Sequence, residues 1–324
     1  MTRILVAGET LIDFIPEERG PIHAVETFHR RAGGAPANVA VGLARLDEPP
    51  LFWTRVGDDP FGDHLVETLT EAGVGADFIE RDPDAGTTLV FVSLDPDAER
   101  SFSFHRDGTA DTRMEPGSVP DGTLSAVDWV HTGGVTLADE PSRAATFDLM
   151  RRASEAAETV VSFDPNARPE LFDEFGFEET CQRAFAVADV VKATAADLIA
   201  AGLVDEATTD DDAPASARAI CAEGPHTALV TRGDDGALVR AEPDAPWNPG
   251  DEPIVVEHDG YAVDPVDTTG AGDAFTAGAI AALANGESVS EAIAFANAVA
   301  ARSTTAKGAM AALPTREAVE SFRE

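Results

Sequence analysis

The chain has 324 residues, 44% of them hydrophobic, and its 59 acidic and 23 basic residues give a formal net charge of −36. This size allows a large buried core, and the acidity disfavours nucleic acid as a partner. The chain has no signal-peptide pattern and no run of about 18 apolar residues, so we expect a cytoplasmic protein that does not contact a membrane.

The acidic residues are scattered among periodic apolar residues, which indicates a charged surface on a folded domain. Almost all basic residues are arginine, since Lys192 and Lys307 are the only lysines. A surface that repels itself this strongly needs screening, and the screening length falls to about 3 Å in 1 M salt. We therefore expect the cytoplasm of a halophile.

Short β-rich runs alternate with helical stretches along the chain. Strand-like runs begin with ILVAG at 4–8 and continue through LFWTRVG, VDWVHTGG, TVVSFDPN, DVVKAT and TALVTRG. This alternation predicts one α/β domain over residues 1–324, with a mostly parallel sheet covered by helices on both faces.

Two intervals interrupt the alternation. Residues 10–31 and 87–106 each contain two extended runs around a polar turn, with no helix between them. This pattern is typical of β-hairpins. We expect the two hairpins to form a small β-sheet that acts as a lid over a cleft.

The stretch DTTGAGDAFTAGAIAAL, at 267–283, places Gly270, Ala271 and Gly272 before an alanine-rich helix. Unpaired amides at a helix start, reached past glycines, make an anion site. Asp273 would repel a phosphate there unless it takes a proton from the group that attacks the phosphate. The spacing alone fits equally well an aspartate that caps the helix.

A second glycine turn lies in RAGGAPANVAVGLARL, at 31–46. Gly33 and Gly34 precede a helix that starts near Pro36, with Asn38 in its first turn; a simple tight turn with an exposed asparagine is the alternative. Together the two stretches resemble the signature regions of the ribokinase/phosphofructokinase-B family of carbohydrate kinases, and the resemblance covers nearly the whole chain. The chain has no GxxxxGK[ST] sequence, so it is not a P-loop kinase.

The resemblance implies a ribokinase-like fold in which Asp273 is the general base and the amides of the preceding turn stabilise the transferred phosphoryl group. The residues that would contact the sugar are Asp13, Gly33, Gly34, Asn38, Phe104, Arg106, Asn166 and Arg168. Three of these positions have simpler interpretations. Asp13 and Arg106 could be solvated residues of a lid strand, and DPN is a common turn.

The resemblance also implies a nucleotide site for ATP with Mg²⁺. Its residues would be Lys192, Thr194, Asp197, Thr231, Gly233, Gly236, Asn297, Lys307 and Gly308. VKATAADL departs from the family's K-x-N-x-x-E element, because Thr194 and Asp197 replace Asn and Glu, so we expect no direct magnesium ligand there. A potassium ion is implied beside Asp267, Thr269 and the loop at 303–313.

The substrate implied by FSFHRDGTAD, VGDDPFG and VDTTGAGDAF is fructose, because these stretches resemble fructokinases more than ribokinases or adenosine kinases. The 2-keto-3-deoxygluconate kinases share the GE-x-L-I-D opening and are the alternative. A ribokinase or a nucleoside kinase fits less well because these stretches resemble those enzymes less, and a non-catalytic sugar sensor fits less well because GAGD is intact. A dehydrogenase would need GxGxxG where this chain has AGETLIDF. Apolar outer faces of the hairpins predict a homodimer joined through the lid.

Overall fold

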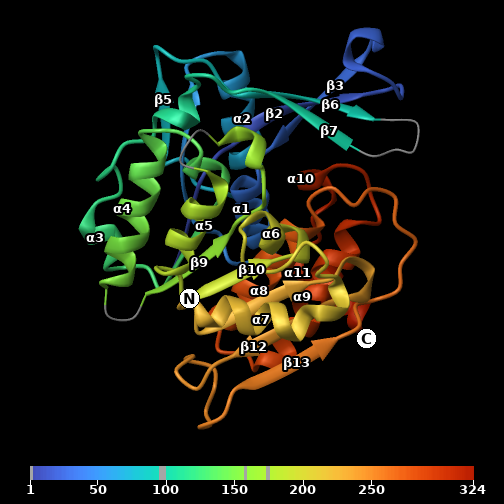
Figure 1. Cartoon of the computed structure of the whole chain (residues 1–324). Coiled ribbons are helices and arrows are strands. Elements are labelled where there is room, and N and C mark those ends of the chain that lie inside the picture. The colour runs from blue at the N-terminus through green and yellow to red at the C-terminus, as the bar shows by residue number, and fades with distance from the viewer. Residues whose placement is uncertain (1–2, 95–99, 157–158, 173–175) are drawn as a thin grey trace.

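A computed structural model describes residues 3–94, 100–156, 159–172 and 176–324. Its main sheet has nine strands (Figure 1). In spatial order these are β13 (Ile254–His258), β12 (Ala237–Ala241), β11 (Thr227–Thr231), β10 (Val190–Ala193), β9 (Val160–Asp164), β8 (Trp129–Gly133), β1 (Ile4–Ala7), β4 (Leu51–Gly57) and β5 (Ile79–Asp82). The strands from β5 to β11 are parallel, whereas β12 and β13 pair antiparallel at one edge. The predicted mostly parallel sheet is confirmed.

Helices cover both faces of this sheet, because its central strands are apolar on both sides. In β1, Ile4 and Val6 face one core while Leu5 and Ala7 face the other. The first core also contains α1 (Ala35–Arg45), α8 (Ala271–Ala284), α9 (Val289–Ser303), α10 (Ala309–Ala312) and α11 (Arg316–Arg323). The second contains α3 (Asp121–Leu124), α4 (Ser142–Ser154), α5 (Phe177–Phe185), α6 (Ala195–Ala200) and α7 (Ala213–Ala222).

The lid is a separate four-stranded sheet that projects from the body (Figure 1). Its order is β3 (Phe28–Gly33), β2 (Leu11–Pro16), β6 (Leu89–Leu94) and β7 (Arg100–His105), with α2 (Pro60–Glu71) packed nearby. The two hairpins pair through β2 and β6, which run parallel. The predicted hairpins are confirmed, although the first extends to Gly33 and the second ends one residue before Arg106.

The lid joins the body at the carboxyl ends of the parallel strands. At β1 the strand order reverses, because β4 pairs with one side of β1 and β8 with the other. Such a switch point leaves a crevice where open α/β sheets bind ligands. The chain passes directly from the end of β1 into β2 and the lid.

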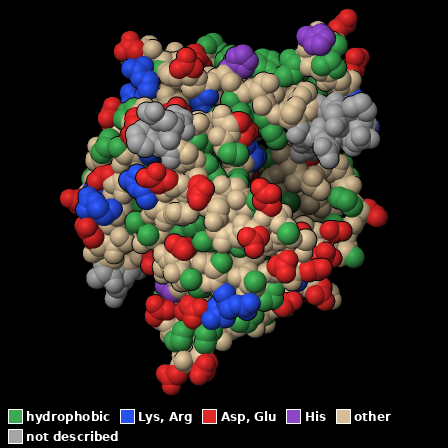
Figure 2. Space-filling model, in the orientation of Figure 1, with side chains coloured by type: hydrophobic (Ala, Val, Ile, Leu, Met, Phe, Trp, Pro, Cys, Tyr) green, Lys and Arg blue, Asp and Glu red, His purple; other side chains and the backbone are tan. Residues whose placement is uncertain are grey.

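Acidic side chains are spread over the visible face of the molecule rather than gathered in one patch (Figure 2). Among the described residues, no helix is long and apolar enough to cross a membrane.

Candidate active site

A cleft of about 350 Å³ lies between the inner face of the lid and the turn that precedes α8. The lid contributes Asp13, Ile15 and Phe102, and the body contributes Asp267, Thr269 and the segment 307–309. The space-filling view shows the molecule hollowed beneath the lid (Figure 2). The cleft therefore brings together segments more than 250 residues apart.

Asp273 lies in the first turn of α8, next to the turn whose Asp267 and Thr269 line this cleft. Gly270 caps the helix with a φ of 79°, a left-handed conformation that favours glycine. The Asp273 side chain does not cap the helix: its Oδ2 accepts a hydrogen bond of 2.7 Å from Asn38 Nδ2 of α1. The capping interpretation is therefore wrong, and Asn38 is buried instead of exposed.

Burial changes the acidity of Asp273, which is only 8% exposed. Loss of hydration raises the pKa of this carboxyl to about 7, although the hydrogen bond from Asn38 and the charges of Lys192 and Arg168 oppose the rise. A carboxylate with this pKa accepts a proton readily near neutral pH. Its position beside helix amides thus combines a base with an anion site.

Lys192 adds a positive charge to this anion site. Its Nζ lies 3.0 Å from the position that a Cβ would occupy on Gly272, so the missing side chain leaves room for the ammonium group. Lys192 Nζ forms a buried ion pair of 3.0 Å with Asp164 Oδ2. Burial opposes the ammonium charge, but the carboxylates of Asp164, Asp197 and Asp273 raise the pKa of Lys192 overall.

Asp164 is a site residue that sequence reasoning missed. It ends β9, and Lys192 lies on the neighbouring strand β10. Burial raises the pKa of Asp164, opposed by Lys192. Asp164 could have been identified from the sequence as the first residue of the DPN turn. Its Oδ1 accepts a 3.1 Å hydrogen bond from the Asn166 amide.

Asp13, Gly33 and Gly34, which were predicted to contact the sugar, meet at the base of β2 and β3. Asp13 pairs with Arg31 across the two strands and faces the cleft. A Cβ on Gly33 would lie 2.1 Å from Asp13 Oδ2, and a Cβ on Gly34, whose φ is 104°, would lie 2.5 Å from the Glu9 carbonyl oxygen. Both glycines are therefore required for the chain to pass this closely. Burial raises the pKa of Asp13 to about 7.

Arg168 links the lid and the body. Its guanidinium carbon lies 5.2 Å from the centre of the Phe102 ring, a cation–π contact. Its charge lowers the pKa values of both Asp13 and Asp273, opposing the effect of burial, so it lies within electrostatic range of both carboxyls. Asn166 adopts a φ of 38° in the turn that positions Arg168.

The lid strand β7 places its residues differently from the sequence prediction. Phe102, which sequence reasoning missed, lines the cleft, and Phe104 lies on the same face of the strand beside it, with ring centres 6.3 Å apart. Alternation along the strand could have identified Phe102.

Arg106 is not among the residues that line the cleft, although it was expected to face the substrate from the lid. It is 5% exposed, its Nε donates to Asp111 Oδ2 at 2.7 Å, and its Nη1 pairs with Asp139. Arg106 follows the end of β7, so its guanidinium lies at the base of the lid. Nearby Glu9 is fully buried, which raises its pKa to about 8.

Asp197 has both carboxylate oxygens engaged by the protein. Oδ2 accepts from Thr194 N and Oγ1, both at 2.8 Å, in a capping box that starts α6. Oδ1 accepts a 2.8 Å hydrogen bond from the Ala167 amide, in the turn that carries Arg168. Asp197 therefore positions that turn.

The remaining predicted nucleotide residues are dispersed. Thr231 ends β11 at the carboxyl edge of the sheet, and Gly233 and Gly236 follow with positive φ in the next turn. Lys307 and Gly308 line the cleft. Asn297 is buried within α9, where its Nδ2 donates to the Ile293 carbonyl at 2.9 Å, so its side chain is engaged by its own helix.

The Asp267 carboxylate ties the turn before α8 to the following loop. Its Oδ1 accepts from Thr269 N at 3.0 Å and Oγ1 at 2.6 Å, and its Oδ2 accepts from Gly308 N at 2.9 Å. Within the described part of the chain, no cluster of three His, Cys, Asp or Glu residues could hold a metal ion. A metal at this site would therefore take most of its ligands from phosphate oxygens and water, as Mg²⁺ does when it is bound with a nucleotide.

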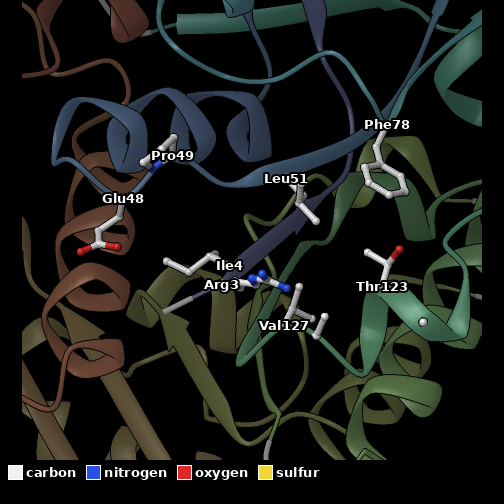
Figure 3. Close-up of a pocket in the computed structure, with 10 residues that line it drawn as sticks. Arg3, Ile4, Glu48, Pro49, Leu51, Phe78, Thr123 and Val127 are labelled. Carbon is white, nitrogen blue, oxygen red and sulfur yellow. The ribbon is translucent and has the colours of Figure 1, made fainter. Parts of the chain in front are cut away.

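A larger cavity, of about 610 Å³, lies away from these residues. Figure 3 shows Leu51, Phe78 and Val127 around it, with Arg3 and Ile4 close by. These residues lie at or next to the amino ends of β1, β4, β5 and β8, the edge of the sheet opposite to Asp164 and Asp273. Its volume therefore does not make it the reaction site, since open α/β sheets bind ligands at the carboxyl edge.

Residues 1–316 match the model of the pfkB family carbohydrate kinases. A fructokinase of Vibrio alginolyticus is 39% identical over 325 residues, which cover 98% of this chain and 97% of the relative. A fructokinase structure with bound ATP from Xylella fastidiosa is 32% identical, with a TM-score of 0.85 over 99% of this chain and 97% of that one. A fructokinase double mutant from Vibrio cholerae, with fructose, ADP and a potassium ion bound, is 34% identical, with a TM-score of 0.84 over 100% and 99% of the two chains.

Proposed function

Because the chain belongs to the pfkB family of carbohydrate kinases, which makes it an ATP-dependent sugar kinase, we propose that its sugar is fructose. The observation that carries the chemistry is the single cluster of Asp273, the Gly270 and Gly272 amides and Lys192. A base and an anion site lie side by side there, which is the arrangement that phosphoryl transfer to a hydroxyl requires.

The sugar is held from the lid side. Asp13 accepts hydrogen bonds from hydroxyl groups, Gly33 and Gly34 let the backbone approach, and Phe102 and Arg168 close over the cleft. One sugar hydroxyl then lies at Asp273, which removes its proton as the oxygen attacks the γ-phosphorus of ATP; the bond from that phosphorus to the β–γ bridging oxygen breaks and ADP leaves. Asn38 keeps the Asp273 carboxylate oriented through its 2.7 Å hydrogen bond.

The phosphoryl group is held from the body side. The Gly270 and Gly272 amides and the Lys192 ammonium face the oxygens on which negative charge is concentrated, whereas the Ala271 amide donates to the Thr268 carbonyl at 3.2 Å. Thr231, Gly233, Gly236 and Lys307 extend this site toward the rest of the nucleotide. The helix amides supply a fixed positive potential at no cost of reorganisation during the reaction.

Mg²⁺ fits this site as an ion delivered with ATP. It neutralises charge on the nucleotide phosphates when bound. Asp164 is engaged by Lys192, and both oxygens of Asp197 are engaged by the protein, so the ion would be held mainly by phosphate oxygens and water.

A potassium ion is the further cation that we propose, beside the turn at 267–270. A related fructokinase structure contains one. Asp267 already joins this turn to Gly308, so a cation there stabilises the segment from which the anion site begins. Its effect is expected on turnover.

A dimer joined through the lids is the proposed assembly, in the salt-rich cytoplasm that the charge of −36 favours. On the outer lid face, Phe14 stacks on Phe91 at 4.8 Å and Phe28 contacts Phe91 edge-on at 5.5 Å, a group of aromatic rings turned away from the cleft. Sedimentation in concentrated KCl tests this assembly. A monomer at all protein concentrations would exclude it.

The choice of sugar is tested with a substrate panel in molar KCl, by coupling ADP release to an optical assay. We expect kcat/KM for fructose to exceed the values for ribose, adenosine and 2-keto-3-deoxygluconate by at least about tenfold, which is about 1.4 kcal/mol of differential transition-state binding. A preference for the keto acid would assign the chain to the alternative substrate. Absence of turnover with any sugar would favour the sensor.

A further inference from the structure

A second groove, of about 540 Å³, lies behind the cleft, between lid strand β3 and the helices α1 and α2. Arg30 and Arg31 reach it from the lid, and Arg45 and His64 reach it from the body. Glu71 is the one carboxylate among its lining residues. The groove thus concentrates positive charge on a chain whose net charge is −36.

The three arginines of this groove lack carboxylate partners in the part of the chain that the structure describes. Within the described residues, Arg30, Arg31 and Arg45 take part in no ion pair, although the chain offers 59 acidic residues and most of its other arginines use them. Arg45 donates instead to the carbonyl oxygens of Ala311, at 3.2 Å, and Leu313. Arg30 Nη2 lies 3.5 Å from His64 Nδ1, a hydrogen bond in which a neutral imidazole accepts from the guanidinium.

The groove therefore brings three guanidinium groups together with no carboxylate of a described residue bound to any of them. Arg30 lowers the pKa of His64, after burial, which is the larger cause, while Glu67 and Glu71 raise it. Guanidinium groups recognise phosphate oxygens through paired N–H donors, and a dianion suits several arginines at once. The volume is also within the range of small-molecule sites.

The groove shares a wall with the reaction cleft. Arg31, Ala32, Gly308 and Ala309 line both. A Cβ on Gly270 would lie 2.8 Å from the Ala309 Cβ, so the shared segment packs directly on the turn that starts α8. An anion in the groove would also connect Arg30 and Arg31 of the lid to Arg45 of the body.

We propose that this groove is a separate binding site for a phosphate monoester, which acts as an effector by holding the lid against the body. The monoester is either a sugar phosphate or a nucleoside monophosphate, since both carry the same dianion. Binding of the monoester at the groove does not depend on the proposed function. The kinetic effect of that binding, a lower sugar KM, rests on the proposed function.

Calorimetric binding tests the proposal, with the cleft filled by fructose and a non-hydrolysable ATP analogue so that the reaction site is blocked. The probes are glucose 6-phosphate, AMP and inorganic phosphate, in the lowest KCl concentration that preserves the melting temperature, because salt screens exposed arginines. The variant is Arg30→Gln, on an exposed side chain outside the reaction cleft. The matched control is Arg218→Gln, which removes one charge from an exposed position on α7.

We expect at least one monoester to bind the filled enzyme, Arg30→Gln to weaken its Kd by about tenfold, and Arg218→Gln to change it less than twofold. Tighter binding of glucose 6-phosphate than of AMP would identify a sugar phosphate as the effector class. Tighter binding of AMP would identify a nucleoside monophosphate. No binding of either monoester, or equal affinity in both variants, would overturn the site.

The kinetic effect is measured as fructose KM with and without the monoester that binds. We expect KM to fall severalfold in the native chain and to stay unchanged in Arg30→Gln. Binding without any change of KM would retain the site but overturn its role as an effector. Turnover of fructose without the monoester is the internal control, because its loss would concern the proposed function and not the groove.

Discussion

Replacing Asp273 by Asn removes the proposed base but keeps the hydrogen bond that it forms with Asn38. The asparagine keeps an oxygen that can accept the hydrogen bond from Asn38 Nδ2, which is 2.7 Å long in the native chain, so the packing of α1 against α8 should persist. It cannot take a proton from a hydroxyl. We expect kcat to fall by a factor of about 10² to 10⁴, the usual contribution of a general base, or about 3 to 5.5 kcal/mol in activation free energy.

The same substitution should stabilise the fold above neutral pH. Burial raises the pKa of Asp273 from 3.8 to about 7, so the native state binds the proton more tightly than the unfolded state. This contribution to stability is complete below the unfolded pKa of about 4 and is lost as pH rises through about 7. Above pH 7 the native chain therefore holds an unfavourable carboxylate, which the Asp273→Asn variant lacks. The gain is at most about 4 kcal/mol, at about 1.4 kcal/mol per pKa unit.

The assay pairs turnover with thermal unfolding from pH 4 to pH 9 in constant molar KCl. Asp77→Asn is the matched control, because Asp77 is exposed and the substitution removes the same charge. We expect Asp273→Asn to be nearly inactive at every pH, more stable than the native chain at pH 8, and close to it near pH 4. The native kcat/KM should decline as pH falls below about 7. Near-normal turnover in Asp273→Asn would refute its role as the base, and a loss of stability at pH 8 would refute the account of its burial.

Three further predictions concern the surroundings of this base. Gly33→Ala should raise the sugar KM at least about tenfold, because its Cβ would lie 2.1 Å from Asp13 Oδ2. Gly75→Ala is the control and should leave KM unchanged, because the space around Gly75 is open. Equal KM values in the two variants would contradict the proposed sugar site. Asp197→Asn should lower kcat severalfold by weakening the hydrogen bond from the Ala167 amide while the Mg²⁺ concentration for half-maximal rate stays the same, and a large rise in that concentration would show instead that Asp197 serves the metal. Exchange of KCl for NaCl at equal molar ionic strength should slow turnover without moving the melting curve, since screening is common to both salts but the site beside Asp267 is not, and equal rates would argue against a specific potassium site.

The sequence by itself determined the architecture and predicted the centre of the proposed reaction site. Alternating strands and helices indicate a parallel sheet because each element carries its own periodicity, and the two glycine turns precede α1 and α8 because glycine is needed locally at both starts. For Asp273 the spacing alone fitted a base and a helix cap equally well, and the resemblance to the carbohydrate kinases favoured the base.

Only the tertiary structure decided which side chains meet across elements. The ion pair of Asp164 with Lys192 depends on β9 and β10 being neighbours, and the second hydrogen bond of Asp197 reaches a residue 30 positions away. Arg106 was expected to face the substrate, and in the structure its guanidinium lies buried against Asp111 at the base of the lid. Local sequence periodicity does not predict such pairings, because they depend on which elements become neighbours in the folded chain.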